Sequence, residues 1–424
     1  MKSLLDRFCR YVRIDTQSVE DAKEYPSSPG QRELGALLAR ELRELGLEDA
    51  AQDAHGIVTA TVPGNVSGAP AIAWLAHLDT SPESSGKGVR PVIHRRYDGR
   101  DIPLPGDRSQ VLRPSETPAL ARLRGRTIIT SDGTTLLGAD DKAGVAVIVT
   151  AVEELLRRPG IRHGPVRVVF TCDEEIGRGC AKIDPKKLGA ACAYTLDGES
   201  EGLIENETFS ADLATVTISG RNIHPGFAKG KMLNAVRLAG RFLERMPWQS
   251  LSPETTSGRE GFLHPYAIDG GVGEVKIKVL LRSFATPELK DQARLLRKVA
   301  ATLLAEFPGA KVVVSTKAQY RNMAESLGRE PRAVRLAASA MRRAGLEPKF
   351  QSVRGGTDGS RLTEMGLPTP NLSVGMYNFH SRLEFACLEE MASAVRTLLE
   401  LARLWGKERA RRRRGRRFGK APRP

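Results

Sequence analysis

Short apolar runs rich in β-branched residues alternate with amphipathic helical patterns through the first half of the chain. Residues 71–76, 166–171 and 193–196 form such runs, and each has the length of a buried strand. Between the first two runs, residues 142–157 place their apolar side chains on one helical face. This alternation is typical of βαβ units, so it predicts an α/β fold with a mainly parallel sheet.

The pattern changes after about residue 207. Strands are predicted at 212–219, at 272–284 together with the run before it, and at 311–316, with helices at 232–245 and 286–307. The resulting order, β-α-β-β-α-β, is that of a ferredoxin-like α+β domain. The α/β pattern resumes near residue 325, with a helix at 332–344 and a strand at 370–374. We therefore predict a catalytic domain over 1–207 and 325–406, with an inserted lid domain over 208–324.

The net charge of +15 is concentrated at the C-terminus. Residues 407–424 hold ten Lys or Arg and one Glu, a net of +9, which leaves +6 for the other 406 residues. Like charges repel and almost nothing apolar offsets the ordering entropy, so we expect a disordered, solubilising tail. The alternative is a weak anchor for RNA or another acidic partner.

The cysteines and the N-terminus indicate a soluble cytoplasmic protein. The five cysteines are scattered and form no CxxC pair, which argues against a disulfide framework or a thiolate zinc site. Cys172, beside an acidic run, is expected to be a buried, inert thiol. The N-terminal segment carries charges every few residues, unlike a signal peptide, and no apolar run is long enough to span a membrane.

Acids and histidines follow the predicted strands. In open parallel sheets, active sites form where the carboxyl ends of the strands meet. Adjacent glutamates elsewhere have plainer explanations: Glu153 and Glu154 lie in a helical pattern and are expected on its solvated face. Five clusters remain: His77 with Asp79, Asp140 with Asp141, Asp173 with Glu174 and Glu175, Asp197, and His380.

These clusters contain the side chains that a two-metal hydrolase needs. Such a site uses a carboxylate that bridges both ions, terminal imidazole and carboxylate ligands, and a free carboxylate that accepts a proton from water. An acid two residues after a ligand histidine can also orient the imidazole ring. The residue types therefore predict a site with two metal ions, although spacing alone leaves Asp140 and Asp141 interchangeable.

Seven stretches of the chain resemble peptidase T, the tripeptide aminopeptidase family within the di-zinc aminoacylase and glutamate carboxypeptidase group. The resemblance covers about residues 4–405 in the same order. The stretches are WLAHLDTSPESSGK, TLLGADDKAG, FTCDEEIGRG, YTLDG, HPGFAKGKMLNA, VRGGTDGSRL and GMYNFHSRLEF.

The resemblance implies a role for each site residue. One zinc ion would be bound by His77, Asp140 and Asp197, and the other by Asp140, Glu175 and His380, with Asp140 as the bridge. Asp79 would orient His77, and Glu174 would be the general base that activates a metal-bridging water. The substrate-binding candidates are His224 as an oxyanion donor, Arg282 and Arg354 for the peptide carboxylate, and Gly356 for close approach of the ligand.

The expected function is therefore release of the N-terminal residue from tripeptides, with two zinc ions per chain. Homodimers are common in the family, so a homodimer is expected. A dipeptidase, a carboxypeptidase or an N-acyl amino acid deacylase is the alternative on the same scaffold. A non-catalytic binding protein, or a protein that binds nucleic acid through its basic tail, is the alternative from another class. The intact set of ligands and the retained Glu174 argue against a mere scaffold.

Overall fold

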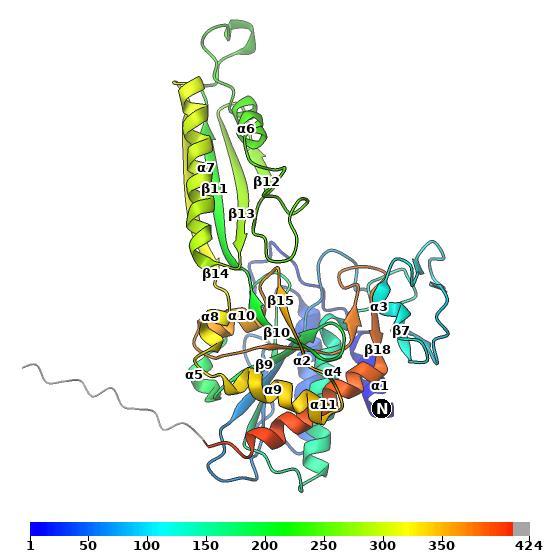
Figure 1. Ribbon diagram of the computed structural model, residues 1–424. Helices are drawn as coiled ribbons and strands as arrows, with labels where there is room; N and C mark the ends of the chain where they lie inside the picture. The colour runs from blue at the N-terminus through cyan, green and yellow to red at the C-terminus, as the bar shows by residue number, and fades with distance from the viewer. Residues whose placement is uncertain (410–424) are drawn as a thin grey trace, which may run out of the picture. The chain divides into compact units, whose positions relative to one another are not determined.

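The computed structural model describes residues 1–409. The chain forms two compact units (Figure 1). The larger unit comprises Met1–Gly202, Arg335–Pro348 and the residues from Leu372 onward, and the smaller comprises Leu203–Val334 and Lys349–Asn371. The predicted domain boundaries stay predictions, because compactness alone does not define an independently folding domain. The predicted disordered tail lies outside the described residues from residue 410 onward.

A mixed sheet forms the centre of the larger unit, with strand order β1-β2-β8-β3-β9-β16. β3 pairs in parallel with both β8 and β9, whereas β2 pairs antiparallel with β1 and β8. Every residue of β3 is buried, as expected of a parallel strand covered on both faces. The α/β prediction is confirmed. The strands are β1 (Ala51–Gln52), β2 (Val58–Val62), β3 (Ile72–His77), β8 (Val166–Thr171), β9 (Ala193–Gly198) and β16 (Asn371–Ser373).

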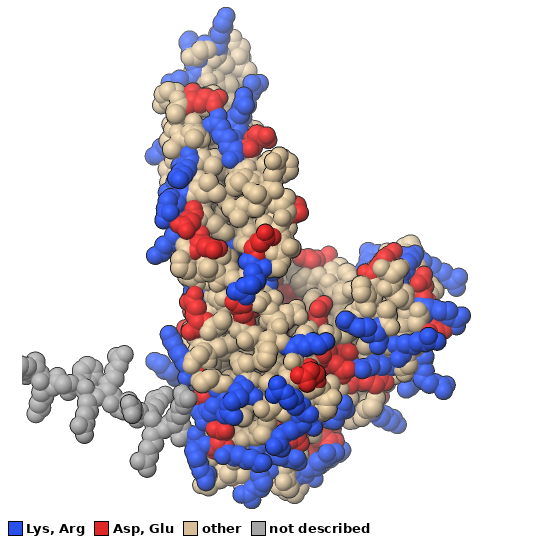
Figure 2. Space-filling view, in the orientation of Figure 1, with Lys and Arg blue, Asp and Glu red and all other residues tan. Residues whose placement is uncertain are grey.

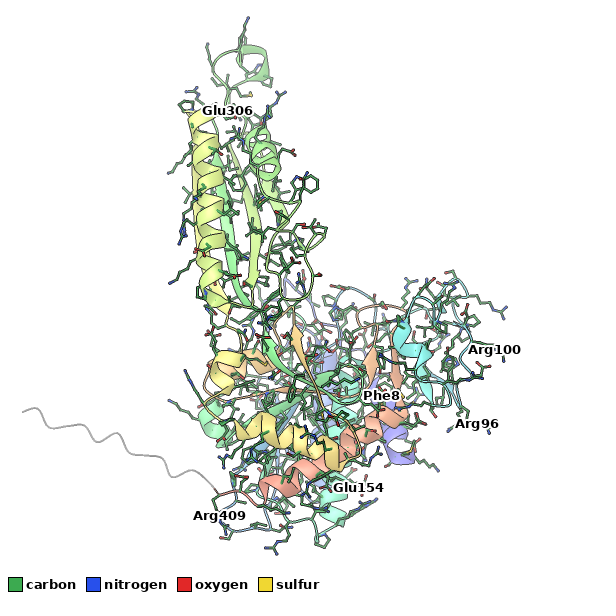
Figure 3. All side chains as sticks on the ribbon, viewed as in Figure 1. Phe8, Arg96, Arg100, Glu154, Glu306 and Arg409 are labelled. Atoms are coloured by element: carbon green, nitrogen blue, oxygen red, sulfur yellow. The ribbon has the colours of Figure 1, made fainter. Side chains whose placement is uncertain are left out.

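Helices pack against this sheet and against one another. α4 contacts β3 and β9, and α1 and α11 pack in turn on α4 (Figure 1). Phe8 of α1, labelled in Figure 3, is completely buried. The helices are α1 (Lys2–Tyr11), α2 (Pro29–Glu44), α4 (Ala139–Arg157), α5 (Pro185–Leu188), α11 (Leu388–Trp405) and most of α9 (Arg332–Arg343).

A second, antiparallel sheet of the larger unit has the order β17-β18-β7-β4. Its core includes Tyr377, Phe385 and Ile128, which cluster with apolar side chains from the preceding loops. The strands of this sheet are β4 (Val92–His94), β7 (Ile128–Thr130), β17 (Met376–Tyr377) and β18 (Phe385–Cys387). Between β4 and β7 in the sequence lie β5 (Ile102–Pro103) and β6 (Val111–Leu112), which pair with each other, and the short helix α3 (Pro118–Ala121).

The smaller unit contains the predicted β-α-β-β-α-β order. Its antiparallel sheet, β12-β13-β11-β14, buries one face against α6 and α7 (Figure 1). Buried and exposed residues alternate along β13, which is the pattern of a sheet solvated on its other face. The elements are β11 (Ser210–Ser219), α6 (Ala235–Glu244), β12 (Phe262–Gly270), β13 (Glu274–Ser283), α7 (Thr286–Glu306) and β14 (Lys311–Tyr320).

The remaining elements of the smaller unit lie before and after this sheet. β10 and β15 pair in parallel. A single 3-10 turn, Pro225–Phe227, follows His224. The other elements are β10 (Leu203–Thr208), α8 (Ala324–Leu327), β15 (Lys349–Val353) and α10 (Asp358–Glu364).

The expectation of a solvated Glu153 is wrong. Glu153 is buried and pairs with Arg7 at 2.6 Å and with Arg157 at 2.5 Å. Its neighbour Glu154, labelled in Figure 3, is only partly exposed and pairs with Arg158 at 2.6 Å. Helix α1 packs on this face of α4, so a carboxylate there needs a cationic partner.

Basic side chains are spread over the surface of the larger unit. Figure 2 shows Lys and Arg gathered over α9 and α11, where Arg343 and Arg403 pair with Glu400. Within the part of the chain that the structure describes, no helix has the length and apolar character needed to cross a bilayer.

Candidate metal centre

The candidate metal ligands of the larger unit lie where its central strands end. His77 is the last residue of β3, and Asp197 lies at the end of β9. Glu174 and Glu175 follow β8 closely, and Asp140 lies at the start of α4. Because β3, β8 and β9 run in parallel, their carboxyl ends bring these side chains to one edge of the sheet.

Asp140 occupies the middle of the cluster. Its Oδ1 lies 2.9 Å from Nε2 of His77, and its Oδ2 lies 3.5 Å from Nε2 of His380. The same nitrogen of His380 lies 2.9 Å from Oε2 of Glu175, and Nε2 of His77 lies 3.8 Å from Oδ1 of Asp197. The two oxygens of one carboxylate thus face two different histidines, each of which also faces another acid.

Asp141 has different partners from Asp140. Its Oδ2 accepts a hydrogen bond from the backbone N–H of His77 at 3.1 Å, and its Oδ1 accepts one from Gly144 at 3.2 Å. The backbone at both aspartates departs from helical φ and ψ values, and the peptide bond between them is cis. The two adjacent acids therefore differ in position: Asp140 faces both histidines, whereas Asp141 is fully buried against the backbone.

Asp79 connects two parts of the cluster. Its Oδ1 lies 3.3 Å from Nδ1 of His77, whose ring also lies 3.1 Å from the carbonyl oxygen of Asp79. The same carboxylate accepts the backbone N–H groups of Glu174 at 3.0 Å and Glu175 at 3.1 Å. Asp79 is fully buried, and its carboxylate contacts both the imidazole of His77 and the turn that carries the two glutamates.

Asp173 supports the acidic run from the other side. It has a positive φ of 60° and is fully buried. Its carboxylate accepts hydrogen bonds from the N–H and hydroxyl of Ser27 and from the side-chain amide of Gln31 at 2.8 Å. Sequence reasoning missed both partners, because they lie more than a hundred residues earlier in the chain and no local pattern marks them.

Burial and mutual repulsion perturb the carboxylates of the cluster. Burial raises the pKa of Asp197 and of Asp141, and it raises the pKa of Glu175 to about 7, with neighbouring carboxylates adding to each shift. Burial alone would raise the pKa of Asp140, but hydrogen bonds from His380 and His77 lower it below its ordinary value. Hydrogen bonds to Asp140 and Glu175 raise the pKa of His380 to about 11. Acids outnumber cations here, which favours a bound metal ion.

The donor set fits such ions. Imidazole nitrogens and carboxylate oxygens from His77, Asp140 and Glu175 lie within 4.8 Å of one another, as do those from His77, Asp141 and Asp197. Oε1 of Glu175 is buried and has no hydrogen-bond partner among the described residues. An orphaned buried carboxylate oxygen is costly unless a cation satisfies it. Mixed nitrogen and oxygen ligands of this kind suit zinc and similar divalent ions.

The substrate-binding candidates His224 and Arg282 lie in the smaller unit. His224 is exposed, and its Nδ1 accepts the N–H of Gly226 at 3.2 Å. The guanidinium of Arg282 donates to Oε1 of Gln319 at 2.9 Å and lies 5.4 Å from the ring centre of Tyr320. Burial lowers the pKa of Arg282, and both of these partners are uncharged.

Arg354 and Gly356, also in the smaller unit, have structural partners there. Arg354 donates to the carbonyl oxygens of Gly258 at 2.9 Å and Glu260 at 2.8 Å. Its guanidinium also stacks 5.2 Å from the ring centre of Phe209. A Cβ at Gly356 would lie 2.4 Å from the ring of Tyr320. The bare backbone at Gly356 therefore accommodates an aromatic ring of the protein itself.

Cys172 and Lys142 are buried near the acidic cluster. All five cysteines are buried, and burial raises the pKa of the Cys172 thiol. The predicted burial of Cys172 is confirmed, and a buried thiol with a raised pKa is a poor nucleophile. Nζ of Lys142 donates to the carbonyl oxygen of Ile14 at 2.8 Å, which ties α4 to the N-terminal segment.

Comparison of the sequence with known proteins identifies a family. Residues 132–404 match the model of peptidase family M20/M25/M40. The chain is 44% identical to a protein from Geobacillus thermodenitrificans described as peptidase T, over 95% of this chain and 98% of that one.

Solved structures give the same result. The crystal structure of aminopeptidase PepT from Bacillus cereus is 25% identical, with a TM-score of 0.74 over 96% of this chain and 99% of that one. The YXEP protein of Bacillus subtilis, described as a dinuclear metal-binding peptidase of the M20 family, shares the fold at 17% identity, with a TM-score of 0.64 over 96% and 99% of the two chains. The chain thus belongs to peptidase family M20/M25/M40 and, within it, to the peptidase T group.

Proposed function

We propose that the chain is an aminopeptidase that uses two zinc ions to release the N-terminal residue of tripeptides. A relative that is 44% identical is described as peptidase T, and a structural relative is described as an aminopeptidase. Another structural relative is described as a dinuclear metal-binding peptidase. The cluster at the sheet edge supplies the donors that two such ions would need.

The observation that carries the proposal is the position of Asp140 between the two histidines. Its Oδ1 lies near His77 and its Oδ2 lies near His380, as expected of a carboxylate shared by two ions. We assign one ion to His77, Asp140 and Asp197, and the other to Asp140, Glu175 and His380. Asp141 is the less suitable bridge, since both of its oxygens accept backbone N–H groups.

The protein groups have distinct tasks in the proposed reaction. Bound zinc ions act as Lewis acids and lower the pKa of a coordinated water molecule. Glu174 accepts the proton of the attacking water and passes it to the leaving amine. Asp79 holds the N–H groups of Glu174 and Glu175 while it contacts His77, so one carboxylate aligns a ligand and the base.

Substrate recognition is assigned to the smaller unit. We keep His224 as the oxyanion donor, since its exposed ring has a second nitrogen available for a ligand. Arg282 is the stronger candidate for the peptide carboxylate, because the side chains that its guanidinium contacts, Gln319 and Tyr320, are uncharged. Arg354 and Gly356 are weaker candidates, because the protein itself occupies the donors of Arg354 and the space at Gly356.

The remaining parts of the proposal rest on the sequence. They are a cytoplasmic location, short peptides as substrates, a homodimer, and at most weak contact of nucleic acid with the basic tail. The scattered cysteines, which form no CxxC pair, motivate the first, and the description of the relative as peptidase T motivates the second. The tail, beyond residue 409, lies outside the described residues.

Substitution of the proposed base tests the mechanism. Glu174→Gln should bind two zinc ions per chain, measured by elemental analysis, yet hydrolyse trialanine at least ~10²-fold more slowly, since a general base contributes about 10²–10⁴-fold. Glu154→Gln, which alters a glutamate at the far end of α4, should keep full activity. Undiminished turnover in Glu174→Gln would refute the role of Glu174 as the base.

A further inference from the structure

Glu384 makes three short contacts with the loop that carries Asp140. Its Oε2 accepts the backbone N–H groups of Leu137 at 2.8 Å and Gly138 at 2.7 Å. Its Oε1 accepts the N–H of Asp140 at 2.9 Å. The side chain is 1% exposed, so water cannot replace these bonds. A single buried carboxylate thus satisfies three backbone donors of one turn.

The local backbone explains why a distant acid is required. Gly138, the residue before α4, has a left-handed φ of 78°, and no side chain of this segment caps the helix. The first N–H groups of a helix have no partner within the helix, and their partial positive charge favours an anion. Glu384 therefore caps α4 from another part of the sequence, 244 residues away from Asp140.

Glu384 is also connected to His380 by a short turn. Its N–H donates to the carbonyl oxygen of Ser381 at 3.2 Å, which closes the short turn between the two residues. The next residue, Phe385, begins β18 and pairs with Thr130 of β7. Both oxygens of the Glu384 carboxylate thus contact the Asp140 loop, while its backbone belongs to the loop that carries His380.

We infer that Glu384 is a positioning residue that sets the distance between the bridging carboxylate Asp140 and the ligand His380. This inference rests on the metal assignment proposed above. Both carboxylate oxygens of Glu384 accept backbone N–H groups, so Glu384 acts through the N–H of Asp140. A residue that only stabilised the fold would have no specific effect on the affinity for the metal ions or on their coordination.

The test uses the full chain and two substitutions. In Glu384→Gln, one oxygen becomes an NH₂ group that must face a backbone N–H, so the Asp140 loop has to move. We expect the affinity for the second equivalent of Co²⁺ to fall about 10–100-fold, with an altered visible spectrum of bound Co²⁺. Glu384→Asp keeps both acceptor oxygens on a shorter side chain and should recover part of the lost affinity.

Glu390→Gln is the matched control. Glu390 is also buried, but its carboxylate accepts the hydroxyl of Tyr377 at 2.6 Å and pairs with Arg126 at 3.4 Å instead of contacting the Asp140 loop. This variant should lose thermal stability without any change in Co²⁺ affinity or spectrum. The inference requires Glu384→Gln to lose far more Co²⁺ affinity than Glu390→Gln does, at a comparable loss of thermal stability.

Two outcomes would overturn the inference. Normal Co²⁺ affinity and spectrum in Glu384→Gln would assign Glu384 a purely structural role, and so would failure of both Glu384 variants to fold. Neither outcome affects the proposed function, which fails separately if the unsubstituted chain binds no metal ion or does not hydrolyse a tripeptide.

Discussion

Gly144 is a position where one added methyl group should damage both the fold and the metal centre. It lies in α4, where the helix packs on β9. A Cβ at Gly144 would lie 2.0 Å from the carbonyl oxygen of Leu196 and 2.4 Å from Oδ1 of Asp141. Ordinary van der Waals contact begins at 3.4 Å, so the first contact is too short by roughly 1.4 Å. The obstructing oxygen belongs to the backbone of β9 and cannot rotate away.

The net effect follows from two opposing terms. Alanine in place of glycine inside a helix stabilises by about 1 kcal/mol where space is open. Overpacking of a tight core costs up to about 3 kcal/mol. We therefore expect Gly144→Ala to lower the free energy of unfolding by about 2 kcal/mol. Asp141 holds the N–H of His77, so its displacement should also weaken metal binding.

Urea unfolding followed by tryptophan fluorescence measures this change. Trp74 and Trp405 are buried in the larger unit and report on its unfolding. Gly160→Ala is the control, since a Cβ at Gly160 has no neighbour within 4 Å, and it should change stability by less than about 0.5 kcal/mol. A Gly144→Ala protein as stable as the unsubstituted chain would refute the packing argument.

Three further predictions concern charge and metal. Hydrogen bonds from Arg259 lower the pKa of Glu207 to about 2, so the stabilisation from this carboxylate is present above its ordinary pKa of 4.5 and is lost as the pH falls from there toward 2. Calorimetry should consequently show that Glu207→Gln lowers the thermal midpoint at pH 7 but not at pH 2. An equal loss at both pH values would contradict the lowered pKa of Glu207. Removal of metal by a chelator should lower the thermal midpoint reversibly, because ions that bind only the folded state stabilise it; an unchanged midpoint would argue against the metal centre. Arg282→Met should raise KM for trialanine about tenfold with a smaller change in kcat, whereas Lys278→Met, at an exposed position of the same strand, should change neither.

The sequence predicted most of the elements because the relevant signals are local. The β8 run and the helix that begins at Thr286 were recognisable from periodicity and the proline at the first turn. The predicted helix at 142–157 begins earlier, at Ala139, since the capping group is Glu384 from a distant segment. The prediction that Glu153 lies on a solvated face was wrong for a similar reason, because its partner Arg7 lies on another helix.

The candidate ligands were predictable because they follow strands whose ends must meet. The residues that hold them in place were not. Ser27 and Gln31 bind Asp173 from a separate segment, and no spacing rule connects them to it. Likewise, the carbonyl oxygens that accept hydrogen bonds from Arg354 belong to a loop almost a hundred residues earlier in the chain. Only the folded chain therefore shows this contact.

The proposed activity is tested most directly with a matched peptide set: Ala-Ala, Ala-Ala-Ala, Ala-Ala-Ala-Ala and N-acetyl-Ala, each assayed with zinc and after chelation. The proposal predicts zinc-dependent release of the first alanine, mainly from the tripeptide. Preferred cleavage of the dipeptide or the acetylated substrate would indicate a sister activity on the same scaffold. Absence of cleavage of any substrate by the zinc-loaded protein would contradict the proposal.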